Sequence, residues 1–170
     1  MTLRGVSQSF RDRADPAAFW EAWVGAVLAR AGLYTTHCPF EIDGKDHGQT
    51  FDLMVGTCPE GDYYDMKPVE VKSLKLTFND PDTYPFDEVL VCSQNSFLRK
   101  WPGRDYSMRD FLFVSTQTGS IVWLPSMTKV TLGREIRDNS RNEVYKAVSA
   151  SKDMLRPLDE FVEYIKGNAW

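Results

Sequence analysis

The first long hydrophobic pattern in the chain has the period of a helix. Asp15 followed by Pro16 is typical of a helix start, because aspartate caps free N–H groups and proline suits the first turn. The segment AAFWEAWVGAVLARAG then ends at Gly32, a common C-terminal stop. Its large apolar side chains form one wide stripe at helical spacing: Trp20, Trp23, Val24, Val27, Leu28 and Ala31. We therefore predict a helix over residues 15–32.

The segments that follow are short and apolar, or alternate between apolar and polar positions, and they predict strands. These predicted strands are residues 34–42, 50–57, 68–78 and 87–93, then a hairpin over 110–125 that turns at Thr118-Gly119. The proline-rich residues 79–86 predict a loop, residues 94–101 a short helix, 142–148 a strand and 158–166 a last helix. This order predicts an α/β fold with a central mixed β-sheet flanked by helices. Because no linker or repeat divides the chain, we expect one domain over residues 1–170, with a core at about 15–125 and a C-terminal extension at about 126–170.

Two charged residues interrupt the longest apolar strand, PVEVKSLKLTF. Glu70 and Lys72 point to one face of that strand, together with Leu74, while Val69 and Val71 point to the other. A surface ion pair and a functional site are both compatible with this spacing. Charges inside an apolar strand favour the interpretation as a functional site, because burying them is costly unless they pair with one another or with a metal ion.

Asp52 interrupts the preceding strand in the same way. If residues 50–57 and 68–78 form a hairpin, Asp52 and Glu70 can converge at the same end of it. Two carboxylates, with the backbone carbonyl of Val71 between them, offer the oxygen ligands that Mg²⁺ or Mn²⁺ prefers. Lys72 could then orient or help to deprotonate a metal-bound water and offset charge on a phosphate.

Asp52 followed by Glu70-Val71-Lys72 resembles the active-site signature of the PD-(D/E)xK nuclease superfamily, which has the restriction-endonuclease-like fold. The resemblance covers roughly residues 15–125 and implies a core in the order α-β-β-β-α-β. It implies a Mg²⁺- or Mn²⁺-dependent nuclease that hydrolyses phosphodiester bonds in DNA, with Asp52, Glu70 and Lys72 as catalytic residues. Many members also carry a glutamate in the first helix, and Glu21 occupies that place. Phe51 departs from the pattern, because the family usually has proline there.

Charge is unevenly distributed along the chain, although the net charge is only −4. Residues 31–94 hold 12 acidic and 4 basic residues, whereas residues 95–156 hold 6 acidic and 11 basic residues. An acidic half can hold divalent cations and a basic half can hold phosphates, although chance segregation on a solvated surface explains the same counts. The candidate contacts to a phosphate backbone are Gln94, just after the fourth predicted strand, and Arg99, Lys100 and Arg104 around Trp101 in the basic half. The alternative is a solvated helix face with Trp101 as its anchor, and a second basic cluster at 134–141 is equally open to both interpretations.

Composition excludes several other classes of protein. Cys38, Cys58 and Cys92 have spacings that match neither a disulfide framework nor a zinc site. No window approaches the roughly 20 apolar residues of a membrane span, and the first 16 residues lack the apolar core of a signal peptide. We therefore expect a cytoplasmic protein, in the host cytoplasm if it is encoded by a phage.

Two alternatives to a nuclease remain at this stage. The first is a catalytically inactive nucleic-acid-binding or protein-interaction module on the same fold, although the complete set of Asp52, Glu70 and Lys72 favours catalysis. The second is a metal-free small-molecule enzyme, for which the sequence offers no glycine-rich phosphate loop and no Ser-His-Asp arrangement. The sequence also leaves open a homodimer, and it does not distinguish endonuclease from exonuclease activity.

Overall fold

The computed structural model describes residues 8–37, 52–58, 66–100, 109–126, 128–139 and 142–167, with only the backbone described at 8–15, 99 and 100. Its helices are α1 (Gln8–Arg30), α2 (Gln94–Lys100) and α3 (Leu158–Ile165). The main sheet has the strand order β1 (Tyr34–His37), β2 (Leu53–Gly56), β3 (Lys67–Leu74), β5 (Asp110–Ser115), β6 (Ile121–Leu124) and β9 (Arg156–Pro157). A second sheet has the order β4 (Glu88–Ser93), β8 (Glu143–Ser151) and β7 (Thr131–Asp138).

The main sheet is mixed, because only one of its strand pairs is parallel. β1, β2 and β3 form an antiparallel meander, β5 lies parallel to β3, and β6 and β9 continue antiparallel. A parallel neighbour needs a crossover connection, and here the chain between β3 and β5 forms β4 and α2 on the way. The prediction of an α/β fold with a mixed sheet is confirmed.

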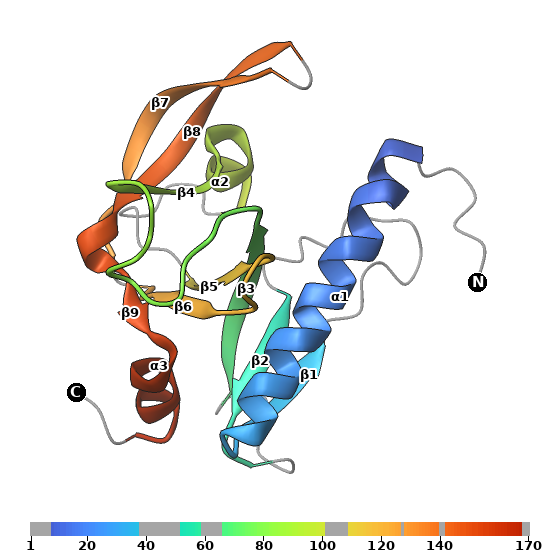
Figure 1. Ribbon diagram of the computed structural model, residues 1–170, viewed down its shortest axis with the longest axis vertical. Coiled ribbons are helices and arrows are strands. Elements are labelled where there is room, and N and C mark those ends of the chain that lie inside the picture. The colour runs from blue at the N-terminus through green and yellow to red at the C-terminus, as the bar shows by residue number, and fades with distance from the viewer. Residues whose placement is uncertain are drawn as a thin grey trace.

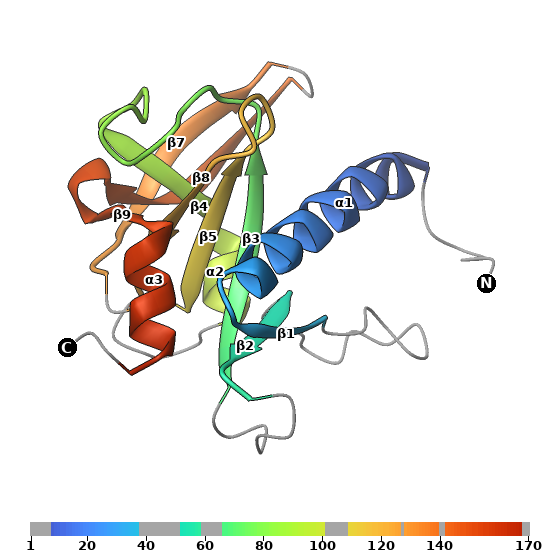
Figure 2. The same ribbon diagram turned by 60° about the horizontal axis from the view of Figure 1, so that its bottom comes forward.

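Each face of the main sheet covers its own hydrophobic core. On one face α1 and α3 pack over Val69, Val71 and neighbouring apolar residues of β2, β5 and β6. On the other face, Phe111 and Phe113 of β5 meet Val89 of β4 and Val148 of β8. Figure 2 shows the two helices in front of the main sheet and the second sheet behind it. The molecule therefore has three layers: helices, main sheet and second sheet (Figure 1).

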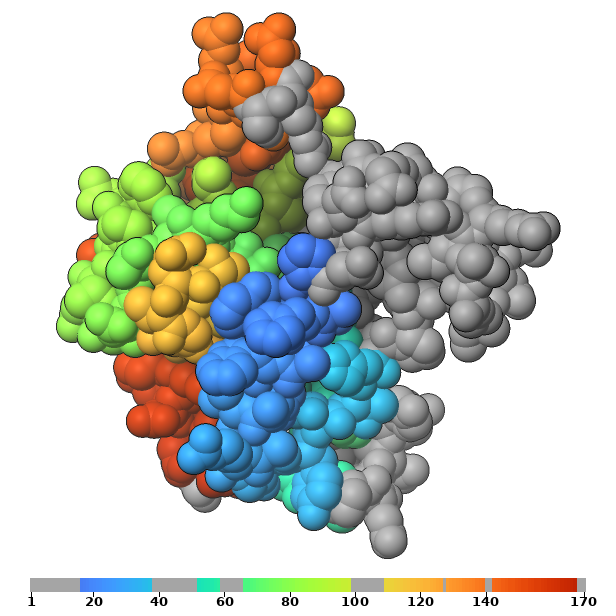
Figure 3. Space-filling model, turned by 45° about the vertical axis from the view of Figure 1, so that its right-hand side comes forward, coloured from blue at the N-terminus to red at the C-terminus, as the bar shows by residue number. Residues whose placement is uncertain are grey.

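Helix α1 begins earlier than predicted. It starts at Gln8 and continues through Pro16, so the prediction of a start at Asp15-Pro16 was wrong. Proline removes one backbone hydrogen bond but keeps a helical φ, and the helix therefore passes through it at some cost in free energy. The end is as predicted, with Gly32 at a φ of 84°. The Trp23 indole anchors the helix by donating to the Gly119 carbonyl at 3.0 Å, and Figure 3 shows the turn between β5 and β6 beside α1.

The other elements match the predicted ones except at their ends and in two strands, β7 and β9, which were not predicted. The described part of the first predicted strand ends at His37, residues 38–51 lie outside the described range, and β3 ends at Leu74 rather than at residue 78. Strand β7 was not predicted, because most of its side chains are exposed and charged residues obscure the apolar alternation. It forms by pairing with β8. Among the described residues, no helix is long and apolar enough to cross a membrane.

Residues 126–170, the predicted C-terminal extension, contribute to both cores. Phe161 of α3 is 0% exposed, and its ring lies 5.5 Å from that of Trp123 in β6. Trp123 in turn donates to Asp110 Oδ1 at 2.9 Å. The end of the chain therefore closes the helical face of the main sheet.

Phe161→Ala should lower the free energy of unfolding by about 3–5 kcal/mol, because it leaves a cavity between α3 and β6. Phe19→Ala is the matched control, since Phe19 is 60% exposed on α1 and its removal should change stability by less than about 0.5 kcal/mol. Chemical denaturation of both variants measures the difference. Equal, small effects would show that α3 is not part of the cooperative core.

Candidate active site

The candidate site lies where β2 separates from β3. The last pair of the ladder is Leu53 with Val69, and just beyond it the Asp52 N–H donates to the Val69 carbonyl at 2.9 Å. The next hydrogen bond has a side chain as its acceptor: the Val71 N–H donates to Asp52 Oδ2 at 2.7 Å. The carboxylate of Asp52 thus replaces a backbone partner and is fixed beside β3. Asp52 therefore lies beside the segment of β3 that carries Glu70 and Lys72, as the predicted hairpin requires.

Glu70 and Lys72 form a short, largely buried ion pair. Lys72 Nζ lies 2.6 Å from Glu70 Oε1, and the side chains are 35% and 2% exposed respectively. The interpretation of the two residues as a solubilising surface pair is therefore wrong. As predicted, they share the face opposite Val69 and Val71, and they pair in register with Phe111 and Phe113 of β5.

The backbone at Val71 offers a further oxygen to the site. In an extended strand, the N–H and carbonyl of one residue point toward the same edge. Since the Val71 N–H points at Asp52, its carbonyl also faces the side from which β2 has departed. This places the carbonyl where the sequence predicted a metal ligand.

Glu21 completes the cluster from the helical side. It lies on the same stripe of α1 as Val24 and Leu28, which are fully buried against the sheet. Partial burial and the negative charge of Asp52 raise the pKa of Glu21 to about 7, although the nearby Lys72 ammonium acts in the opposite direction. Glu21 and Asp52, 31 positions apart in the sequence, therefore lie close enough to repel each other.

Lys72 remains a cation in this environment. Burial acts to lower the pKa of its ammonium, but the Glu70 carboxylate, through charge and hydrogen bonding, and the charges of Asp52 and Cys92 outweigh burial and raise that pKa above its ordinary value. Cys92 brings β4 of the second sheet to the site. Among the described residues, the cluster brings the carboxyl groups of Glu21, Asp52 and Glu70 close to the Lys72 ammonium.

Two neighbours of the cluster, His37 and Cys92, were not predicted from the sequence. His37 of β1 lies with Nδ1 4.0 Å from Glu21 Oε2, and its side chain is half exposed. Cys92 of β4, whose spacing matches neither a disulfide framework nor a zinc site, is half-buried, and its charge interacts with the Lys72 ammonium. The alternation of YTTH over β1 would have placed His37 on a defined face, but nothing in the sequence shows that this face meets Glu21.

The donor set is compatible with a hard divalent cation, although it is not a complete cage. Within the described parts of the chain, no three His, Cys, Asp or Glu side chains gather closely enough to hold a metal ion between them. Mg²⁺ commonly binds one or two carboxylates and takes its other ligands from water and substrate phosphates. Asp52, Glu70 and the Val71 carbonyl would supply protein oxygens of this kind. A divalent cation would neutralise the negative charge of Asp52, which acts together with burial to raise the pKa of Glu21.

The predicted substrate contacts are only partly described. Gln94 is the first residue of α2, and its Oε1, buried and without a hydrogen-bond partner among the described atoms, lies near Gly133 of β7. Arg99 and Lys100 lie on α2 with only their backbone described, and Trp101 and Arg104 lie outside the described ranges. Arg134 forms an ion pair with Glu88 on the second sheet.

Asp52→Asn should lower the pKa of Glu21 toward its ordinary value, because it removes the negative charge nearest to that carboxyl group. Addition of Mg²⁺ to the unsubstituted protein should lower it as well. Carbon-detected NMR titration of the Glu21 carboxyl group measures both effects. A Glu21 pKa that neither change moves would show that Glu21 does not share the site with Asp52.

Comparison with known proteins identified no relative of the chain. No family model, no curated protein and no solved structure matches the chain.

Proposed function

We propose that the protein is a metal-dependent nuclease of the PD-(D/E)xK type that hydrolyses phosphodiester bonds in DNA. The observation that carries the proposal is the convergence of Asp52, Glu70 and Lys72 where β2 leaves β3, with Glu21 of α1 beside them. Burial of these groups has a cost in stability that a purely structural site would not require.

The order of elements agrees with the proposed core only in part. The chain runs α1, β1, β2, β3, β4, α2 and β5, so that β4 interrupts the α-β-β-β-α-β order that the resemblance implies. Within the main sheet the corresponding strands are adjacent in the order β1-β2-β3-β5. The structure departs from that core in two ways. β4 joins a second sheet, and α2 packs against β4 and β8 of that sheet.

In this proposal each side chain has a separate role. Asp52, Glu70 and the Val71 carbonyl would hold the Mg²⁺ or Mn²⁺ ion, which would supply polarisation of the phosphate and activation of the attacking water. The Lys72 ammonium, whose pKa is raised, stays protonated near neutral pH. It therefore orients the water and offsets charge on the phosphate, and it does not accept a proton. Glu21, with a pKa of about 7, is the group whose proton affinity suits proton transfer near neutral pH.

Lys72→Ala and Glu70→Gln should each lower Mg²⁺-dependent cleavage of DNA by about 100-fold or more, because each removes a group that acts on the transition state. Lys166→Ala is the matched control, since Lys166 is exposed beyond α3. The assay uses linear, nicked, supercoiled and branched DNA with Mg²⁺, Mn²⁺ or EDTA. Binding of every substrate without cleavage of any would favour the inactive binding module instead.

Asp52→Asn and Asp52→Ala should separate the metal-binding role of Asp52 from its structural one. Asparagine keeps an oxygen that can accept from the Val71 N–H and removes carboxylate repulsion, so stability should be retained or improved while Mn²⁺ affinity is lost. Alanine should also lose Mn²⁺ and lower stability by about 1–3 kcal/mol, because the Val71 N–H loses its acceptor. Calorimetric Mn²⁺ titration and thermal unfolding measure the two effects. Full Mn²⁺ affinity in Asp52→Asn would contradict the proposed ligand set.

A further inference from the structure

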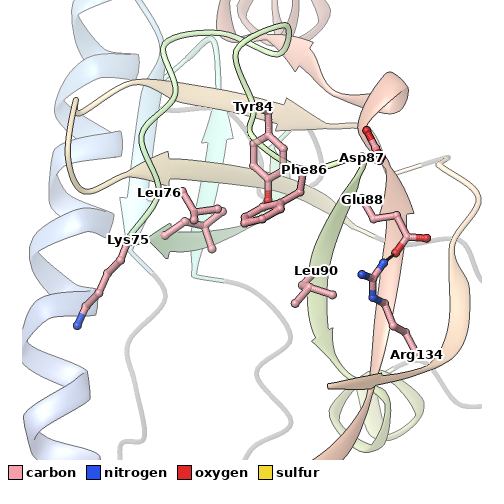
Figure 4. A pocket seen from close by; sticks show the side chains of 9 residues that line it. Lys75, Leu76, Tyr84, Phe86, Asp87, Glu88, Leu90 and Arg134 are labelled. Carbon is pink, nitrogen blue, oxygen red and sulfur yellow. Dashed lines mark ion pairs between the residues drawn. The ribbon is translucent and has the colours of Figure 1, made fainter. Parts of the chain in front are cut away.

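A second concave feature lies beside the candidate active site. It is a pocket of about 710 Å³, formed by the end of β3, the loop that follows it, β4 and β7. Its lining residues are Leu74, Lys75, Leu76, Tyr84, Phe86, Asp87, Glu88, Leu90 and Arg134. A volume of this size is typical of pockets for small organic groups. Figure 4 shows Tyr84 and Phe86 on one side of it, with Leu76 and Leu90 facing the same space.

The pocket and the candidate site draw residues from the same two strands, β3 and β4. Leu74 follows Lys72 by two positions on the same face of β3, which corresponds to about 7 Å along the strand. On β4, Cys92 interacts electrostatically with the Lys72 ammonium, and Leu90 lines the pocket. A phosphate held at Lys72 would therefore have a neighbouring nucleotide within reach of the pocket, since successive nucleotides of a strand lie only about 3.4 Å apart even when fully stacked.

The pocket wall is pre-organised around an exposed aromatic ring. Phe86 is 55% exposed, and its ring packs edge to face on Tyr84 at 6.4 Å. Tyr84 is buried against Phe78, with ring centroids 5.4 Å apart. Asp80 Oδ1 accepts from the Thr83 N–H at 2.8 Å and fixes the preceding turn of the loop. An aromatic face held in this way can stack on a base at little entropic cost.

The charges around the pocket favour an uncharged, flat group over a phosphate. Arg134 and Glu88 neutralise each other in an ion pair. Lys75 and Asp87 are both exposed and of opposite sign. The remaining lining is apolar or aromatic, so the pocket suits the base while the phosphate lies toward Lys72.

From these observations we propose that the pocket binds an unpaired DNA base next to the phosphate at Lys72, with Phe86 as its stacking surface. This inference rests on the proposed nuclease function and specifies its substrate as DNA with a single-stranded segment. An intact duplex keeps its bases stacked and would have to flip one out to fill the pocket, at a cost of a few kcal/mol.

Fluorescence anisotropy of a labelled single-stranded oligonucleotide, with EDTA to prevent cleavage, tests the inference on the full chain. Phe86→Ala should weaken binding of the single strand by about 5- to 100-fold, because stacking on an aromatic ring is lost, and should leave duplex binding unchanged. Phe86→Trp should retain the affinity. Phe19→Ala, a change of an equally exposed phenylalanine on α1, is the matched control and should bind as the unsubstituted protein does.

A 2-aminopurine base placed at successive positions in the oligonucleotide reports stacking directly. In the unsubstituted protein its fluorescence should be quenched at one position, and in Phe86→Ala this quenching should be lost. Unchanged affinity in Phe86→Ala, or an equal loss for duplex and single strand, would overturn the inference. Because the assay needs no cleavage, its failure is distinguishable from failure of the nuclease proposal. Loss of cleavage in Lys72→Ala would still support the nuclease if Phe86 proved irrelevant.

Discussion

The hydrogen bond from the Val71 N–H to Asp52 Oδ2 is the interaction on which the arrangement of the site depends. It ends the ladder between β2 and β3 without leaving an unpaired backbone group, because a side-chain oxygen takes the place of a carbonyl. The same contact holds the Asp52 carboxylate beside β3, on the side of the strand toward which the Val71 carbonyl points. If β2 continued to pair with β3, the backbone of β2 would occupy the space into which Asp52 now points.

The electrostatics of the cluster follow from that constraint. Glu70 is almost fully buried and pairs with Lys72 at 2.6 Å. Burial of Glu21, followed by the negative charge of Asp52, disfavours ionisation of Glu21 and raises its pKa to about 7, against the opposing effect of the Lys72 ammonium. Such an environment has a cost in stability, and it leaves Glu21 as a group that exchanges protons near neutral pH.

The sequence predicted most of the strands and the central residues of the site, because each carries a local signal. Glu70 and Lys72 stand out as charges in an apolar strand, and a hairpin is enough to bring Asp52 to them. Other features depend on packing between distant segments. Strand β7 is formed by pairing with β8 rather than by its own alternation, and the contact of His37 with Glu21 depends on how α1 crosses β1.

The start of α1 and the pocket show two further limits of local patterns. Pro16 signals a helix start, but the loss of one hydrogen bond does not end a helix that is otherwise favourable. Residues 79–86 read only as a proline-rich loop, whereas hydrogen bonds within it and packing of Tyr84 on Phe78 give that loop a defined shape. No sequence pattern shows that this shape presents Phe86 beside the end of β3.

We propose that Asp52, just before β2, together with Glu70 and the Val71 carbonyl of β3, holds one divalent cation. Anomalous scattering from a crystal grown with Mn²⁺ locates the ion without any assumption about activity. One peak is expected within coordination distance of Asp52, Glu70 and the Val71 carbonyl, with Lys72 adjacent. A peak elsewhere, or none at these oxygens when Mn²⁺ is in excess, would contradict this proposal.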